Sequence, residues 1–155
     1  LKGGAKLLCG GKKIEKIGNL KGFFYEPTLF TNVECSMRIA QEEIFGPSVA
    51  LISIKDLNGA IKAANSVCYG LSSAIYTRSI KNAMKAIEKV EAGLTYVNSS
   101  TIGSEAHLPF GGVKETGNGT REGGIEGINE FSEIKTAYID YSGRLQKAQI
   151  DFVKD

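Results

Sequence analysis

Residues 71–97 constrain the fold more than any other part of the chain, because they predict a strand, a helix and a second strand in direct succession. The first strand is predicted at 71–76. Ser79 is the predicted N-cap of a helix whose apolar residues recur at helical spacing until Gly93 ends it, and 94–97 predict the second strand. Strands that alternate with helices of this length form right-handed crossovers. We therefore predict an α/β fold in three αβα layers, with a mainly parallel sheet.

The flanking sequence extends this alternation. Residues 23–30 and 48–54 are rich in apolar, aromatic and β-branched side chains and predict two further strands. A helix is predicted at 57–66, with Asp56 as its N-cap, because the carboxylate can accept a hydrogen bond from a first-turn amide. The first eleven residues contain paired glycines and no complete element, so we predict no regular structure there.

The C-terminal third is predicted to be less regular. Residues 98–121 are rich in glycine, serine and threonine without periodicity and predict a long loop, and long ordered loops in compact domains are usually functional. A short helix is predicted from Glu122. Residues 134–141 predict a strand whose mixed composition, with Lys135 and Asp140 among apolar residues, suits a selective sheet edge.

Composition narrows the functional classes. The net charge of +2 is too small to indicate a nucleic-acid partner. The longest apolar run, around 49–54, is too short to cross a bilayer and no secretory leader is visible, so we expect no membrane association and a cytoplasmic location. Three cysteines without CxxC spacing suit reduced thiols, and the single histidine, His107, cannot complete a metal cluster.

Two motifs carry possible chemistry. In the first, Glu43 and Phe45 are separated by one residue before Gly46-Pro47, so in an extended segment they project to the same side. A carboxylate there can accept hydrogen bonds from vicinal ribose hydroxyls, and an aromatic face can pack on a nicotinamide ring. The alternative is a surface glutamate beside a core phenylalanine.

The second motif is Pro109-Phe110-Gly111-Gly112-Val113-Lys114, followed by Gly117-Asn118-Gly119 and Arg121-Glu122. It places one rigid aromatic side chain against two glycines that permit close backbone approach, which suits the wall of a pocket. The alternative for Phe110 is a core anchor. For Glu122 it is a glutamate that interacts favourably with the N-terminus of a helix.

Together these motifs resemble the C-terminal part of NAD(P)-dependent aldehyde dehydrogenases. Residues 23–30, 69–72 and 93–98 also look like landmarks of that family, in the family's order, so the resemblance covers nearly the whole chain. The tail at 140–146 is closest to semialdehyde-oxidising members, such as those that act on 2-oxoglutarate semialdehyde. The resemblance implies two parts: 1–133, a partial catalytic domain, and 134–155, an oligomerisation strand and tail.

The resemblance also assigns roles by position. Glu43 and Phe45 would contact the nicotinamide ribose and ring of NAD or NADP, and Phe110 would line the aldehyde tunnel. Ile102 and His107 belong to the preceding loop, 99–108, which varies with the substrate in the family. Glu122 would relay a proton from the hydrolytic water, although Thr120 stands between Gly119 and Arg121 where many members have no residue.

This family's reaction requires a cysteine thiolate, and none of the three cysteines stands in the family's Gly-Gln-x-Cys context. We expect the nucleophile and the cofactor-binding fold to lie upstream of this sequence, so that the chain alone is inactive and binds NAD or NADP poorly. Two functions stay open: part of a dehydrogenase completed by another polypeptide, or a non-catalytic interaction or oligomerisation module. The expected partners are an aldehyde and either further copies of the chain or a complementing N-terminal chain.

Overall fold

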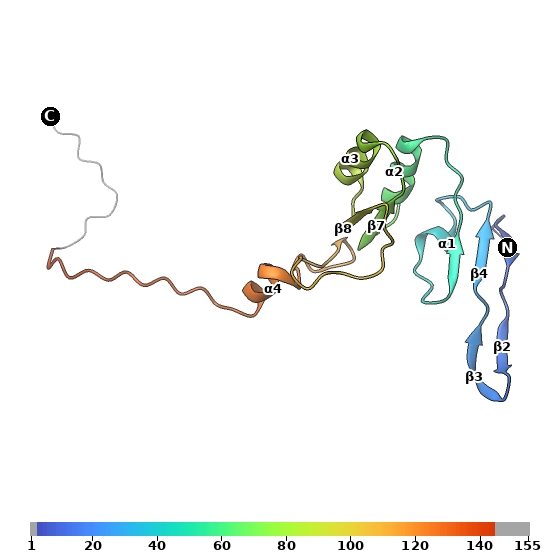
Figure 1. Ribbon diagram of the computed structural model, residues 1–155, viewed down its shortest axis with the longest axis horizontal. Coiled ribbons are helices and arrows are strands. Elements are labelled where there is room, and N and C mark those ends of the chain that lie inside the picture. The colour runs from blue at the N-terminus through green and yellow to red at the C-terminus, as the bar shows by residue number, and fades with distance from the viewer. Residues whose placement is uncertain (1–2, 145–155) are drawn as a thin grey trace.

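The computed structural model describes residues 3–144, which contain thirteen helices and strands (Figure 1). Near the N-terminus, β1 (Lys6–Cys9), β4 (Thr28–Thr31) and β5 (Ser48–Ala50) form one sheet in the order β1-β4-β5. The β1-β4 pair is antiparallel and the β4-β5 pair is parallel, so the sheet is mixed. β1 therefore corrects the prediction that residues 1–11 contain no complete element.

A separate hairpin projects from this sheet (Figure 1). It consists of β2 (Lys13–Ile17) and β3 (Leu20–Tyr25), which pair antiparallel with an irregularity between Ile14 and Lys16. The predicted strand at 23–30 is thus divided between β3 and β4. Pro27 lies at the division, where a residue without an amide hydrogen cannot donate to a sheet.

The predicted crossover at 71–97 is present. β7 (Ser72–Ile75) and β8 (Leu94–Val97) are parallel and in register from one end to the other, joined by α3 (Ile80–Lys89). Before them, α2 (Leu57–Asn65) packs beside α3 (Figure 1).

Both predicted N-caps of these helices are confirmed. The Asp56 carboxylate accepts a hydrogen bond from the Gly59 amide at 2.8 Å, and the Ser79 hydroxyl accepts one from Asn82 at 3.3 Å. Each bond satisfies an amide that the helix itself leaves unpaired, which is why these residues fix where α2 and α3 begin.

Short elements complete the described chain. α1 (Arg38–Gln41) precedes β5. The two-residue strand β9 (Val113–Lys114) lies in the predicted long loop and pairs antiparallel with β6 (Tyr69–Gly70), which precedes β7. α4 (Gly124–Glu130) is the short helix expected near Glu122.

Two features of the predicted architecture are not found in the described residues. Four small sheets take the place of one continuous, mainly parallel sheet in three layers. Residues 134–144 form no strand, because a strand needs a neighbour and no other described segment pairs with them; Figure 1 shows them as an extended segment after α4. Residues 145–155 of the predicted C-terminal part lie outside the described residues.

The core is small. The buried residues among those described are Thr28, the glycines Gly70 and Gly112, and four small or medium apolar residues, Ala5, Val33, Ala83 and Ala86. The accessible surface is 13105 Å². A compact monomer of this mass would expose about 7,600 Å². Part of the excess lies in the extended C-terminal segment, but large apolar residues throughout the chain are also exposed.

Candidate functional site

The segment between α1 and β5 carries the first motif. α1 ends at Gln41, and an ion pair of 2.7 Å between Arg38 and Glu42 spans its last turn. Glu43 follows with an exposed side chain. Phe45 has φ of 52° and is 91% exposed, so the backbone leaves the extended conformation between the two motif residues.

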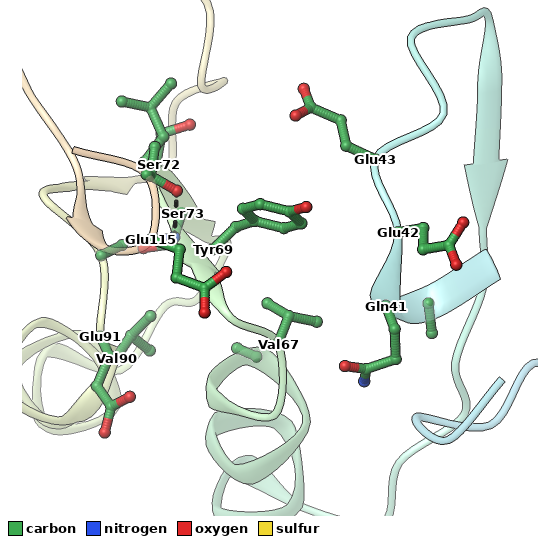
Figure 2. A pocket seen from close by; sticks show the side chains of 16 residues that line it. Gln41, Glu42, Glu43, Val67, Tyr69, Ser72, Ser73, Val90, Glu91 and Glu115 are labelled. Atoms are coloured by element: carbon green, nitrogen blue, oxygen red, sulfur yellow. Dashed lines mark hydrogen bonds between the residues drawn. The ribbon is translucent and has the colours of Figure 1, made fainter. Parts of the chain in front are cut away.

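Glu43 borders a cavity of about 830 Å³ between α1 and the β6-β7 region. Figure 2 shows its carboxylate directed across the gap toward the elements that carry Tyr69 and Ser72, with Glu115 on the far side. Backbone bonds hold the far wall: the Glu115 amide donates to the Cys68 carbonyl at 3.0 Å, and the Gly70 amide donates to the Thr116 hydroxyl at 2.8 Å.

Tyr69 is the titratable group that this environment perturbs. The electrostatic effect of the neighbouring Cys68 side chain and its hydrogen bond with Tyr69 raise the pKa of the Tyr69 hydroxyl above its ordinary value. Desolvation and the carboxylates of Glu115 and Glu43 raise this pKa further. The cavity therefore favours a neutral phenol and has an acidic rim.

Phe45 lies on a different hollow. It borders a space of about 820 Å³ beside the β2-β3 hairpin, which Phe23 and Phe24 also line and which Glu43 does not. Both motif residues line a smaller pocket of about 300 Å³. The prediction that they project to the same side assumed an extended segment, and the positive φ at Phe45 interrupts the alternation of such a segment.

Phe110 and Glu122 are brought together by the backbone. The Phe110 amide donates to the Glu122 carbonyl at 2.6 Å, and the Glu122 amide donates to the Phe110 carbonyl at 2.8 Å, which forms an isolated antiparallel bridge. Phe110 is half-buried and Glu122 is exposed. A Cβ on Gly111 would lie 2.8 Å from the Arg121 side chain, so glycine permits this approach.

The loop at 99–108 lies against the same region. The Gly124 amide donates to the Ala106 carbonyl at 2.9 Å, and the Tyr96 hydroxyl donates to the Gly103 carbonyl at 2.6 Å. His107 is exposed and Ile102 is 87% exposed, so both side chains are available to another molecule.

The structure therefore forms two groups of predicted site residues. His107, Phe110 and Glu122 come from segments that backbone bonds connect, whereas Glu43 and Phe45 lie on the other side of the cavity; within residues 3–144, no hydrogen bond or ion pair joins the two groups. Sequence reasoning missed Tyr69, Glu115 and Lys114 as cavity and support residues. Tyr69 and Lys114 could have been found from the sequence, because Tyr69 begins one motif segment, 69–72, and Lys114 ends another, 109–114.

No three His, Cys, Asp or Glu side chains between residues 3 and 144 are grouped so that they could hold a metal ion. Over the same range, every helix is too short or too polar to traverse a bilayer.

Solved structures with a similar fold include aldehyde dehydrogenases, some of them in complex with NAD+. The NAD-dependent aldehyde dehydrogenase from Sinorhizobium meliloti matches 96% of this chain with a TM-score of 0.85 and 34% identity, over 28% of its own length. The model of the aldehyde dehydrogenase family matches residues 1–137. The chain belongs to the aldehyde dehydrogenase family, as its motifs predicted.

Two curated relatives are semialdehyde dehydrogenases. The alpha-ketoglutaric semialdehyde dehydrogenase of Bacillus subtilis is 40% identical over 136 residues, which are 88% of this chain and 28% of the relative. The alpha-ketoglutarate semialdehyde dehydrogenase of Haloferax volcanii is 45% identical over 139 residues, 89% of this chain and 29% of the relative. The chain spans less than a third of the length of these relatives.

Proposed function

We propose that this chain is the C-terminal part of an NAD(P)-dependent aldehyde or semialdehyde dehydrogenase and supplies one wall of an active site that another polypeptide completes. The observation that carries the proposal is the backbone bridge between Phe110 and Glu122. The bridge joins the backbones of two residues, one with an aromatic side chain suited to a substrate wall and one with a carboxylate that can hold a proton, which supports the proposal. The names of the curated relatives favour an oxo-acid semialdehyde as the substrate.

The residues present fit a nicotinamide nucleotide. Glu43 offers an exposed carboxylate able to accept two hydrogen bonds from a ribose diol, and Phe45 offers an exposed aromatic face. When bound, NAD(P) would accept the hydride that leaves the aldehyde carbon. The role of this chain is to orient the ribose through Glu43 and to support the ring through Phe45.

In the proposed reaction, a cysteine thiolate of the completing polypeptide adds to the aldehyde carbon. Loss of hydride from that carbon leaves a thioester, and water then attacks the thioester to release the carboxylate and the thiolate. Phe110 limits the aldehyde's approach, and Glu122 takes the proton that the attacking water releases. We assign no nucleophilic role to this chain's own cysteines, of which Cys9 is exposed and Cys35 and Cys68 are half-buried.

The exposed surface supports a macromolecular partner. The accessible area is larger than a compact monomer of this mass would show, by about 5,500 Å². A standard interface covers about 800 Å² on each partner. An occupant of domain size, such as the complementing polypeptide, would cover such an area, and a cytoplasmic location is proposed with it because the three cysteines are free thiols.

A second function is favoured by the same surface. Exposed large apolar residues, including Phe23, Phe131 and Tyr138, would also suit a non-catalytic interaction or oligomerisation module derived from the enzyme. The two functions differ in whether Glu43 and Glu122 matter for a reaction or whether only the apolar surface matters for assembly.

The test combines calorimetry with reconstitution. The chain is titrated with NAD and NADP, alone and after mixing with a separately expressed polypeptide that carries the cofactor-binding fold and the cysteine. We expect negligible binding alone, and binding with semialdehyde oxidation in the mixture. Glu122→Gln should lower kcat by about 100-fold, within the usual range for a proton-transfer group, whereas the control Glu126→Gln in α4 should leave it unchanged.

Assembly without cofactor binding would contradict the enzymatic role and support the interaction module. Equal activity of Glu122→Gln and the unaltered chain would remove Glu122 from the reaction while leaving the dehydrogenase role in place.

A further inference from the structure

Lys114 makes contacts that the proposed reaction does not use. Its ammonium donates to the Val67 carbonyl at 2.7 Å and to the Asn65 carbonyl at 3.2 Å, and it lies 3.5 Å from a Glu91 carboxylate oxygen. The side chain is 22% exposed, whereas most lysines of this chain are exposed. The two carbonyls lie at and just beyond the C-terminal end of α2, where a helix leaves carbonyl groups unpaired.

Asn65 extends the same junction. Its side-chain amide donates to the Lys89 carbonyl at 2.8 Å and accepts a hydrogen bond from the Glu91 amide at 2.9 Å. Asn65 therefore joins the end of α2 to the end of α3, and Lys114 attaches the β9 segment to both. These contacts connect three segments that are far apart in the sequence: the end of α2, the end of α3 and β9.

The backbone at Lys114 is strained. Its φ is 56°, a left-handed conformation that glycine adopts freely and a lysine adopts at a cost. The neighbouring backbone is tightly packed, because a Cβ on Gly112 would lie 2.6 Å from the Thr116 side chain and 3.3 Å from the Gly70 carbonyl oxygen. The conformational cost of a residue other than glycine at position 114 must be offset by other contacts. The Lys114 ammonium makes three, with Val67, Asn65 and Glu91.

We propose that Lys114 is a positioning residue: its ammonium fixes the Phe110–Lys114 loop against the α2-α3 junction and so sets where Phe110 and its bridge to Glu122 stand. The effect on the aldehyde rests on the function proposed above. The attachment of the loop does not, so the two can fail separately.

Three substitutions in the full chain separate the ammonium from the backbone strain. Lys114→Met keeps most of the aliphatic stem and removes the donors. Lys114→Gly relieves the strain and also removes the donors. Lys62→Met removes an exposed lysine of α2 that makes no ion pair among the described residues, and it serves as the control.

Amide hydrogen exchange of the chain alone is the first readout. Loss of hydrogen bonds from a charged donor should raise the exchange rate of the Glu115 and Thr116 amides about tenfold or more in both Lys114 variants. The central amides of α2 should not change, and Lys62→Met should behave like the unaltered chain. Unchanged exchange in Lys114→Met, or protection in Lys114→Gly equal to that of the lysine, would overturn the proposal.

Steady-state kinetics of the reconstituted enzyme is the second readout. We expect Lys114→Met to raise KM for the aldehyde several-fold more than it lowers kcat, because a displaced Phe110 weakens substrate positioning. Faster exchange with an unchanged KM would show that Lys114 stabilises the loop without positioning the substrate, and it would overturn the positioning role. If no variant and no unaltered chain reconstitutes activity, the proposed function fails, and the exchange result still decides the attachment.

Discussion

Phe45 combines two properties that seldom occur in one residue. Its backbone is left-handed, with φ of 52°, and its aromatic ring is 91% exposed. The first property costs conformational energy and the second gains almost no burial, so neither stabilises this chain. A residue kept under such conditions is better explained by a contact with another molecule, which is consistent with its proposed place beside a nicotinamide ring.

This explanation predicts the effect of removing the ring. Phe45→Gly should not destabilise the chain and should raise its unfolding free energy by up to about 1 kcal/mol, because glycine adopts this φ without strain. Phe23→Gly is the matched control: Phe23 is 98% exposed but lies in β3, where glycine weakens a strand by about 1 kcal/mol. Urea unfolding followed by circular dichroism measures both. Equal losses in the two variants would contradict the strain at Phe45.

The acidic rim of the cavity predicts a pH-dependent signal. The phenol of Tyr69 should titrate above 10.0, because nearby negative charge disfavours the phenolate. Cys68→Ser should lower this pKa most, since Cys68 is its largest cause, and Glu43→Gln should lower it less. Ultraviolet absorbance measures the titration, with Tyr69→Phe subtracted to remove the other tyrosines. The contrast fails if Glu126→Gln, remote in α4, shifts the midpoint as much as Glu43→Gln does.

Among the elements, the start of β8 depends on a glycine contact. A Cβ on Gly93 would lie 1.8 Å from the Gly111 carbonyl oxygen, so β8 and the Pro109–Lys114 loop can meet only without a side chain there. Gly127 in α4 offers the opposite situation, since a Cβ there would meet its nearest neighbour at 3.6 Å, an ordinary contact.

Alanine substitutions at these two glycines should therefore have opposite effects. Gly93→Ala should lower the unfolding free energy by about 2 kcal/mol or more, because backbone must move to admit the methyl group. Gly127→Ala should raise it by up to about 1 kcal/mol through helix propensity. Thermal unfolding distinguishes the two, and a neutral Gly93→Ala would show that β8 and the loop separate readily.

Sequence patterns predicted the elements whose causes are local. The caps at Asp56 and Ser79 and the strand at 94–97 were confirmed, because a cap depends on one side chain and its own first turn. Pro27 could have indicated that 23–30 is not one strand, because proline has no amide hydrogen to donate to a sheet. The site could be predicted only by resemblance to a family, since Phe110 and Glu122 meet through a bridge between segments that no spacing rule indicates. The positive φ at Phe45 could not be predicted either, because phenylalanine does not favour that backbone conformation.

At the scale of the whole molecule, no large side chain among the described residues is fully buried. The sheets are small and the segment after α4 is extended (Figure 1), and many large apolar side chains are exposed to water. The hydrophobic contribution to folding grows with the area removed from water, so a chain that buries little is expected to be marginally stable by itself.

Such a surface should bind a hydrophobic dye. The chain alone is expected to enhance ANS fluorescence, and Phe23→Gln should lower that signal because Phe23 is among its most exposed apolar residues. Lys16→Gln, in the same hairpin, is the control and should leave the signal unchanged. Addition of the complementing polypeptide should lower the fluorescence as well. Strong fluorescence that persists in the mixture would argue against a partner that covers this surface.

The loop at residues 99–108 is held by contacts that do not involve its own side chains. The Tyr96 hydroxyl donates a hydrogen bond to the Gly103 carbonyl within the loop, and the Phe110–Glu122 bridge lies just after its end. Its sequence can therefore be exchanged as a cassette while the aromatic wall and the carboxylate stay in place. Substrate range and chemical step become separately adjustable, so grafting the loop from a relative with another aldehyde preference is the natural way to change the one without rebuilding the other.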